Sequence, residues 1–198
     1  MKRLSRIIGA TALVMMATAG PAMAAGNQPL RTLHIDESVL ALDNGRIFPT
    51  PEEPLDCPAW AEWVFFSNGT GQMHHLGHFE MALTQCSHFP MGPPVGYSEG
   101  TTTFTAANGD MLVLAHILPW EIIFSDLIED EWDGFEGEGT WVVDHGTGRF
   151  ANASGEGTIL MQGDIPSDDT PLFDLPPGST LWTFTGDVEY RPSDRSTK

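Results

Sequence analysis

Short apolar runs separated by glycine and proline make up most of the chain beyond residue 30, and the 3.6-residue periodicity of amphipathic helices is nearly absent. The 21 glycines and 15 prolines bound segments rich in Thr, Val, Ile, Phe and Trp. This pattern is typical of an all-β sandwich or barrel. We expect eight strands, over residues 31–41, 61–67, 71–84, 98–106, 111–118, 137–144, 154–162 and 180–190.

Alternation within the strand expected over residues 71–84 separates a polar face from an apolar face. The polar face carries Gln72, His74, His78 and Glu80, and the apolar face carries Met73, His75, Phe79, Met81 and Leu83. Because successive side chains of a strand point to opposite faces, the apolar set is expected inside the barrel. His75 would then be the polar group inside a ligand cavity, and a core histidine with satisfied hydrogen bonds is the competing interpretation.

Aromatic residues recur on the faces that we expect to point inward. In the last strand, Trp182, Phe184, Val188 and Tyr190 share one face. A packed barrel core explains such a face, but an eight-stranded barrel is also wide enough to hold one small ligand. The predicted cavity lining consists of His75, Met73, Phe79, Phe104, Trp141, Trp182 and Phe184.

Two glycine-containing stretches predict how neighbouring strands are joined. Asn108-Gly109 between two β-rich runs predicts an antiparallel hairpin with a type I′ turn, in which both central residues have positive φ. The segment GTGRFANASGEGTI, residues 146–159, is expected to be a corner between two strands. Its glycines at 146, 148 and 155 would adopt unusual backbone angles, Phe150 would anchor it to the core, and Arg149 would face an acidic surface.

Long acidic or proline-rich stretches are expected to be connections outside the sheet. They cover residues 42–59, 119–136 and 163–179, and the tail 191–198 is expected to be disordered.

The first 24 residues have the pattern of a secretory signal: basic Lys2, Arg3 and Arg6, an apolar run, and the small-residue site Ala22-Met23-Ala24. Cleavage would leave residues 25–198, with a single barrel domain over 25–190, in the periplasm or outside the cell. The apolar run is shorter than the roughly 20 residues of a membrane span, and no later segment is long enough. In such an oxidising compartment, Cys57 and Cys86 are expected to form a disulfide.

The mature chain would be strongly acidic. The signal contains three of the nine basic residues and none of the 27 acidic ones. Six basic residues would therefore face 27 acidic ones, which argues against binding to nucleic acid or to anionic lipid.

Four segments together resemble a known family: GQMHHLGHFEM, TTTFTAANGDMLVL, GTGRFANASGEGTI and FTGDVEY. Over residues 60–190 the chain resembles exported bacterial proteins with an allene oxide cyclase-like barrel, a fold shared in outline with plant dirigent proteins. The most specific piece is GTGRFANASGEGT, which is similar to a GTG-x-F-x-x-A-x-G segment of both groups. The resemblance implies a closed eight-stranded antiparallel barrel with an apolar interior and no cofactor. The shared segment is architectural, so no catalytic residue is carried over.

Metal and nucleophile chemistry find little support in the sequence. His78 and Glu80 lie two positions apart on one strand and could converge on a cation with His116 or His34, but a solvated outer face explains them better. Starting at Glu129, the acidic stretch places Thr140 where a calcium-binding EF-hand loop needs glutamate. We therefore expect no resident metal, although weak Ca²⁺ binding by an acidic loop stays open. Motifs for a phosphate loop or a nucleophile elbow are absent.

Three functions remain open at this point. The first is an exported barrel that binds a small hydrophobic molecule. The second is a cofactor-independent cyclase or isomerase of the allene oxide cyclase-like type, and the third is a structural or interaction protein whose barrel is filled. An open apolar cavity would favour the first two, and an inward-facing acid or histidine without a structural partner would favour catalysis.

Overall fold

The computed structural model describes residues 28–47, 57–88, 95–124, 132–164 and 179–192. The signal segment, most of the tail, most of the connection predicted at 163–179 and half of that predicted at 42–59 lie outside these residues; residues 42–47 belong to the first strand instead. Within them, no helix is long and apolar enough to cross a membrane.

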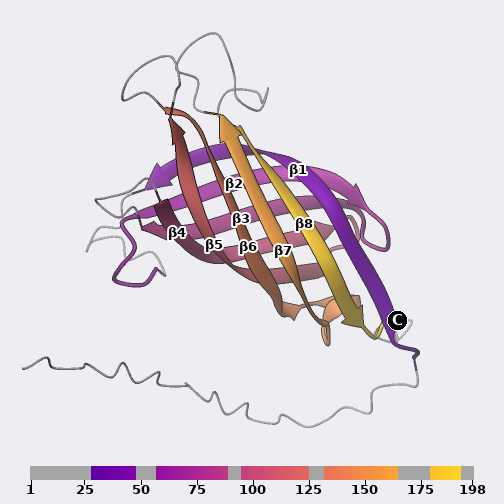
Figure 1. The fold of residues 1–198 in the computed structure, drawn as a ribbon. Helices are drawn as coiled ribbons and strands as arrows, with labels where there is room; N and C mark the ends of the chain where they lie inside the picture. The colour runs from indigo at the N-terminus through magenta and orange to yellow at the C-terminus, as the bar shows by residue number, and fades with distance from the viewer. Residues whose placement is uncertain (1–27, 48–56, 89–94, 125–131, 165–178, 193–198) are drawn as a thin grey trace, which may run out of the picture.

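Eight antiparallel strands form a closed barrel in which each strand pairs with its neighbours in the sequence and β1 pairs with β8 (Figure 1). The strands are β1 (Arg31–Ile47), β2 (Trp63–Met73), β3 (Gly77–His88), β4 (Val95–Ala106), β5 (Met111–Phe124), β6 (Trp132–Gly146), β7 (Ser154–Asp164) and β8 (Ser179–Tyr190). A 3-10 turn, η1 (Gly148–Phe150), lies between β6 and β7. The predicted all-β class and the closed eight-stranded antiparallel barrel are confirmed.

The barrel has two different ends. Short connections join β2 to β3, β4 to β5 and β6 to β7 at one end, which we call the hairpin end. The longer connections lie at the opposite end, which we call the loop end.

The strand predicted over residues 71–84 is wrong in one respect, because a tight turn at residues 74–76 divides it between β2 and β3. Met73 pairs directly with Gly77 across the turn, and both His75 and Gly77 have positive φ, 69° and 75°. Cross-strand partners share a face of the sheet. The alternation therefore keeps the same phase on both sides of the turn, which is why Met73 and Phe79 are both buried as predicted.

The connection predicted over residues 119–136 is also wrong over most of its length, because β5 continues to Phe124 and β6 begins at Trp132. Glu121 lies directly opposite Glu136 in this part of the sheet. Glu121 is exposed, whereas the adjacent Ile122 is only 5% exposed. Glu121 and Glu136 thus belong to the solvated face of the sheet, which is compatible with pairing in an antiparallel sheet.

The interior near the hairpin end is filled by an aromatic core made of Phe79, Phe104, Phe150, Phe184 and Tyr190. Phe104 makes edge-to-face contacts with Phe79 and Phe184, with ring centroids 5.2 Å apart in both pairs. The ring centroids of Phe150 and Tyr190 are 5.0 Å apart. Such aromatic pairs stabilise a fold by about 0.5–1.5 kcal/mol each beyond the area that they bury.

From the middle of the barrel to the loop end, polar side chains are buried beside apolar ones such as Leu118, Ile122 and Met161. None of the polar residues, which we call the polar interior, is more than 4% exposed: Ser67, Gln85, Ser87, Ser98, Thr102, His116 and Thr180. Some of their polar atoms pair with one another, since the Ser87 and Ser98 hydroxyl oxygens are 2.7 Å apart and the Trp120 indole N–H donates to Ser98 Oγ at 2.9 Å. The sequence predicts an apolar interior, but the buried side chains include a polar group in this half of the barrel.

The predicted disulfide between Cys57 and Cys86 is confirmed, with Cα atoms 5.7 Å apart. It links the segment before β2 to the last residues of β3, near the loop end. Because the neighbouring Gln85 and Ser87 belong to the polar interior, the alternating Cys86 belongs to the outer wall.

Candidate functional site

The hairpin end is held together by the turn between β4 and β5. The Gly109 amide donates to the Ala106 carbonyl at 2.8 Å, and the Ala106 amide donates to the Asp110 carbonyl at 2.9 Å. Among the non-glycine residues described, only His75 has positive φ, so Asn108 does not, whereas Gly109 has φ 83°. The hairpin is confirmed, but the type I′ prediction is wrong, because this is the three-residue loop in which a type I turn is followed by a left-handed glycine.

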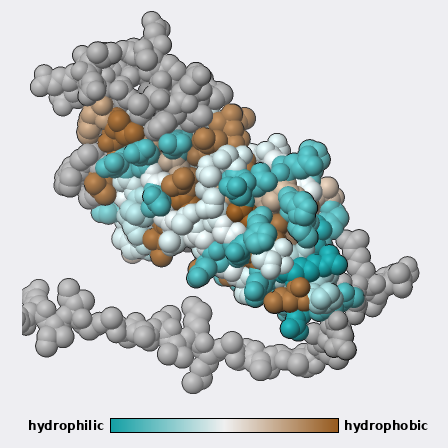
Figure 2. Space-filling model, turned by 45° about the vertical axis from the view of Figure 1, so that its right-hand side comes forward, coloured by the Kyte–Doolittle hydropathy of each residue, from teal (hydrophilic) through white to brown (hydrophobic). Residues whose placement is uncertain are grey.

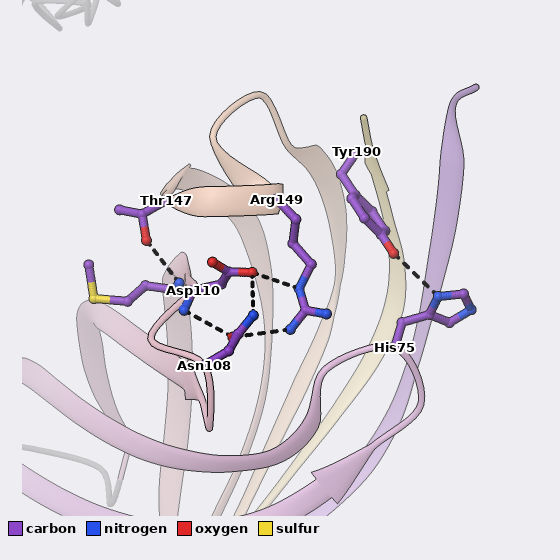
Figure 3. Close-up of polar contacts among 7 residues, drawn as sticks. His75, Asn108, Asp110, Thr147, Arg149 and Tyr190 are labelled. Carbon is purple, nitrogen blue, oxygen red and sulfur yellow. Dashed lines mark hydrogen bonds and ion pairs between the residues drawn. The ribbon is translucent and has the colours of Figure 1, made fainter. Parts of the chain in front are cut away.

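The segment GTGRFANASG packs against that turn (Figure 3). The Arg149 guanidinium lies 3.1 Å from the Asp110 carboxylate and 3.5 Å from Asn108 Oδ1. Gly148 has φ 58°, and a Cβ added there would overlap the Asp110 carboxylate. Phe150 is fully buried.

The segment is therefore the strand-to-strand corner that the sequence predicts, with Phe150 in the core and Arg149 against an acidic group. Of the three glycines expected to have unusual backbone angles, only Gly148 has positive φ; Gly146 and Gly155 are instead sites of close backbone approach. The corner seals the hairpin end and has an architectural role.

His75 does not point into the barrel, so that prediction is wrong. It is exposed in the turn between β2 and β3, and its Nδ1 lies 3.3 Å from the Tyr190 hydroxyl (Figure 3). Partial burial lowers the pKa of His75, and the neighbouring charges of His74, Arg31 and other basic groups lower it further. Residues 74–76 form a turn, so the alternation of strand faces does not hold at His75.

The other predicted lining residues are all buried and belong to one packed hydrophobic cluster: Met73, Phe79, Phe104, Trp141, Trp182 and Phe184. Within it, the Trp141 indole N–H donates to the Thr158 carbonyl at 2.9 Å. That these six residues line a ligand cavity stays a prediction.

The histidine that the barrel does enclose is His116, which is 2% exposed on β5. Its Nδ1 lies 3.4 Å from the Thr102 hydroxyl, and its Nε2 has no hydrogen-bond partner among the described residues. Burial lowers its pKa from 6.5 to about 4. The imidazole is consequently neutral at neutral pH, with one nitrogen able to donate and the other able to accept a hydrogen bond.

Two further buried polar atoms lack a partner in the described part of the chain, Gln85 Oε1 and Trp182 Nε1. Buried polar side chains are usually hydrogen-bonded, because leaving one unpaired costs about 1–3 kcal/mol. The barrel interior therefore contains three polar atoms that would be stabilised by a hydrogen-bonding partner: one acceptor, one donor and one imidazole nitrogen.

Gln85 and His116 lie on either side of a glycine. Gln85 pairs with Gly100 across β3 and β4, and Gly100 pairs with His116 across β4 and β5. Neighbouring strands are about 4.8 Å apart, so the two backbones are about 10 Å apart. Between them β4 has no side chain, and a Cβ at Gly100 would overlap the Thr84 carbonyl.

Trp182 lies on the wall that faces His116 across the barrel. His116 belongs to a row of directly paired residues that crosses the sheet from near the loop end of β3 to near the hairpin end of β1. The row consists of Gln85, Gly100, His116, Trp141, Gly157, Gly186 and Ile35. The strands of a barrel tilt by about 35–45°, so equal height is offset by about one residue per strand. Over the three strands from β5 to β8 the offset amounts to about three to four residues toward the loop end, from Gly186 to the region of Trp182.

His116 appears in the sequence interpretation only as a possible third metal ligand. The run Leu112 to Leu118 is apolar on both faces apart from His116, so alternation alone does not show which way the histidine points. Only the pairing of β5 with β4 and β6 orients it inward.

The residues considered for a metal site do not come together. His78 and Glu80 are exposed on the outer wall, as expected for a solvated face, and His34 is exposed and paired with Asp187. Within the described ranges, no three His, Cys, Asp or Glu side chains are grouped so as to hold a metal ion. Residues 129–131 of the acidic stretch lie outside those ranges.

The outer wall carries several open grooves and apolar side chains. One groove of about 430 Å³ lies over β1 to β4, and two of about 360 Å³ lie over β3 to β6 and over β4 to β7. On the face shown in Figure 2, hydrophobic residues are concentrated toward one end of the barrel and hydrophilic ones toward the other. Leu42, Ile117 and Val142 are among the exposed apolar residues, at 49–61% exposure.

Comparison with protein-family models, with curated proteins and with solved structures gives no match.

Proposed function

We propose that the protein is an exported barrel that binds one small, largely apolar molecule inside its loop-end half. The observation that carries this proposal is the set of three buried polar atoms without described partners: Gln85 Oε1, His116 Nε2 and Trp182 Nε1. A filled structural barrel would lose stability by keeping them, because an apolar residue of similar shape avoids the desolvation penalty. A ligand that supplies the missing hydrogen bonds gives a physical reason for their presence.

The division of the interior supports the same proposal. The packed aromatic core of the hairpin end provides a rigid apolar floor. Ligand sites typically combine such apolar walls with a few placed polar groups that orient the ligand.

A second candidate function is a cofactor-independent isomerase or cyclase of the allene oxide cyclase-like type. His116 favours it, because a buried neutral imidazole can accept a proton at one nitrogen and hydrogen-bond through the other. In such an enzyme the barrel would hold one reactive conformation of the substrate, and His116 would move the proton.

The proposal is tested by expressing the full chain with its signal segment and extracting the native protein. We expect mature protein that begins at Ala25 and releases one apolar compound, identified by mass spectrometry. A protein that releases no compound and binds none of a broad panel of apolar probes would refute ligand binding and leave the structural barrel.

The two functions are separated by returning the extracted compound to ligand-free protein. Conversion of the compound by the natural protein, together with binding but no conversion by His116→Gln, would establish the enzyme. Binding without conversion by both proteins would establish the binding protein.

A further inference from the structure

We infer that the bound molecule carries one uncharged head group that both donates and accepts hydrogen bonds, such as an alcohol or phenol hydroxyl, placed between Gln85, His116 and Trp182. This inference rests on the proposed function and specifies the chemical class of its ligand.

The hydrogen-bonding capacity of the three residues sets the first requirement. Gln85 Oε1 can only accept a hydrogen bond, so it requires a donor on the ligand. The Trp182 indole N–H can only donate, so it requires an acceptor. A hydroxyl group meets both requirements with a single atom, and His116 Nε2 can take either role according to its tautomer.

All three residues face the barrel interior. Gln85 and His116 lie two strands apart on either side of Gly100, and Trp182 faces the interior from β8, where its pairing partners Val39 and Met161 are also buried. Below them the aromatic core closes the barrel toward the hairpin end. The head group would therefore lie in the middle of the barrel, with the apolar part of the ligand extending toward the loop end.

The burial of His116 favours an uncharged head group. His116 is neutral at neutral pH because of its burial, so it offers no positive charge to a carboxylate placed beside it. Burying a carboxylate against a neutral partner is strongly unfavourable.

Four naphthalene derivatives with the same ring test the head-group requirement by isothermal titration calorimetry at pH 7.5. They are 2-naphthol, which donates and accepts; 2-methoxynaphthalene, which only accepts; naphthalene, which does neither; and 2-naphthoate, which is charged. We expect 2-naphthol to bind about tenfold more tightly than 2-methoxynaphthalene or naphthalene, as one additional buried hydrogen bond implies. We expect 2-naphthoate to bind most weakly.

Two tryptophan variants provide a matched comparison. Trp182→Phe removes the unpaired indole N–H, whereas Trp141→Phe removes one that already donates to the Thr158 carbonyl. Both tryptophans are buried, at 2% and 1% exposure, so the two changes remove similar volume. We expect Trp182→Phe alone to abolish the preference for 2-naphthol over naphthalene.

Gln85→Met provides a readout that is independent of the tryptophans. We expect it to lower the affinity for 2-naphthol several-fold and to raise the Tm of the empty protein by about 2–4 °C, because it removes an unpaired buried acceptor. A lower Tm would show that Gln85 is already paired and would overturn the inference.

The inference and the proposed function fail in different ways. Equal affinity for 2-naphthol and naphthalene, tightest binding of 2-naphthoate, or equal effects of the two tryptophan variants would each overturn the inference and leave apolar binding intact. Absence of binding by all four compounds, with no compound released on native extraction, would refute both.

Discussion

Acid pH should destabilise the protein through His116, and replacing that residue by leucine should remove this part of the pH dependence. The folded protein keeps the imidazole neutral, with a pKa of about 4, whereas an exposed histidine has a pKa of 6.5. Below pH 6.5 the unfolded chain therefore binds a proton that the folded protein does not. The stability associated with neutral His116 is complete above pH 6.5 and is lost as the pH falls toward 4.

The size of this effect follows from the pKa difference. Each pKa unit corresponds to about 1.4 kcal/mol, so the complete loss would be about 3 kcal/mol below pH 4. Between pH 7.5 and pH 5 the expected loss is about 2 kcal/mol. This is a substantial fraction of the 5–15 kcal/mol or so by which a typical domain is stable.

The assay is urea denaturation at pH 7.5 and at pH 5, for the natural protein, His116→Leu and the control His145→Gln. His145 is exposed and pairs with Asp144, so its replacement leaves the contribution of His116 in place. We expect the free energy of unfolding to fall by about 2 kcal/mol less in His116→Leu than in the other two proteins. Parallel losses in all three proteins would refute a buried neutral His116.

Two other predictions concern the connections of the barrel. Replacing both Cys57 and Cys86 by serine should lower the free energy of unfolding by about 3–4 kcal/mol, since the bridge closes a loop of 29 residues; equal urea midpoints with and without the bridge would contradict this. Gly148→Ala should cost more than Gly109→Ala, because both have positive φ but only the former would overlap Asp110. Gly109→Ala should lower the free energy of unfolding by about 1–2 kcal/mol, and Gly148→Ala should lower it clearly more. Equal losses for the two variants in thermal denaturation would exclude a role for the Asp110 contact.

Local pattern predicts most of the sheet because antiparallel neighbours in the sequence form its pairs. The β4–β5 hairpin is recognisable from Asn108-Gly109, and the buried face of β8 from the alternation that ends at Tyr190. The turn at residues 74–76 escaped prediction because its glycine, Gly77, follows residues that continue the alternating pattern. Over residues 71–84, the alternation of polar and apolar residues in two strands and their turn is the same as that of one long strand.

The candidate site depends on contacts between strands that are distant in the sequence. Gln85 and His116 are 31 positions apart in the sequence, and Trp182 belongs to the last strand. Each is a single polar residue in an apolar or mixed segment, so no local pattern distinguishes it from a surface residue. Pairing across Gly100 and closure of the barrel by β1 and β8 bring them to one interior.

The sequence by itself determined the β class, the phase of alternation in most strands and the pair of cysteines, because each depends on residues close together or on a choice with one solution. The tertiary structure alone decided that His75 lies outside and His116 inside. The physical reason is register, since a side chain's face depends on the partner strand against which it is placed. The tilt of a closed barrel then determines which inward residues meet.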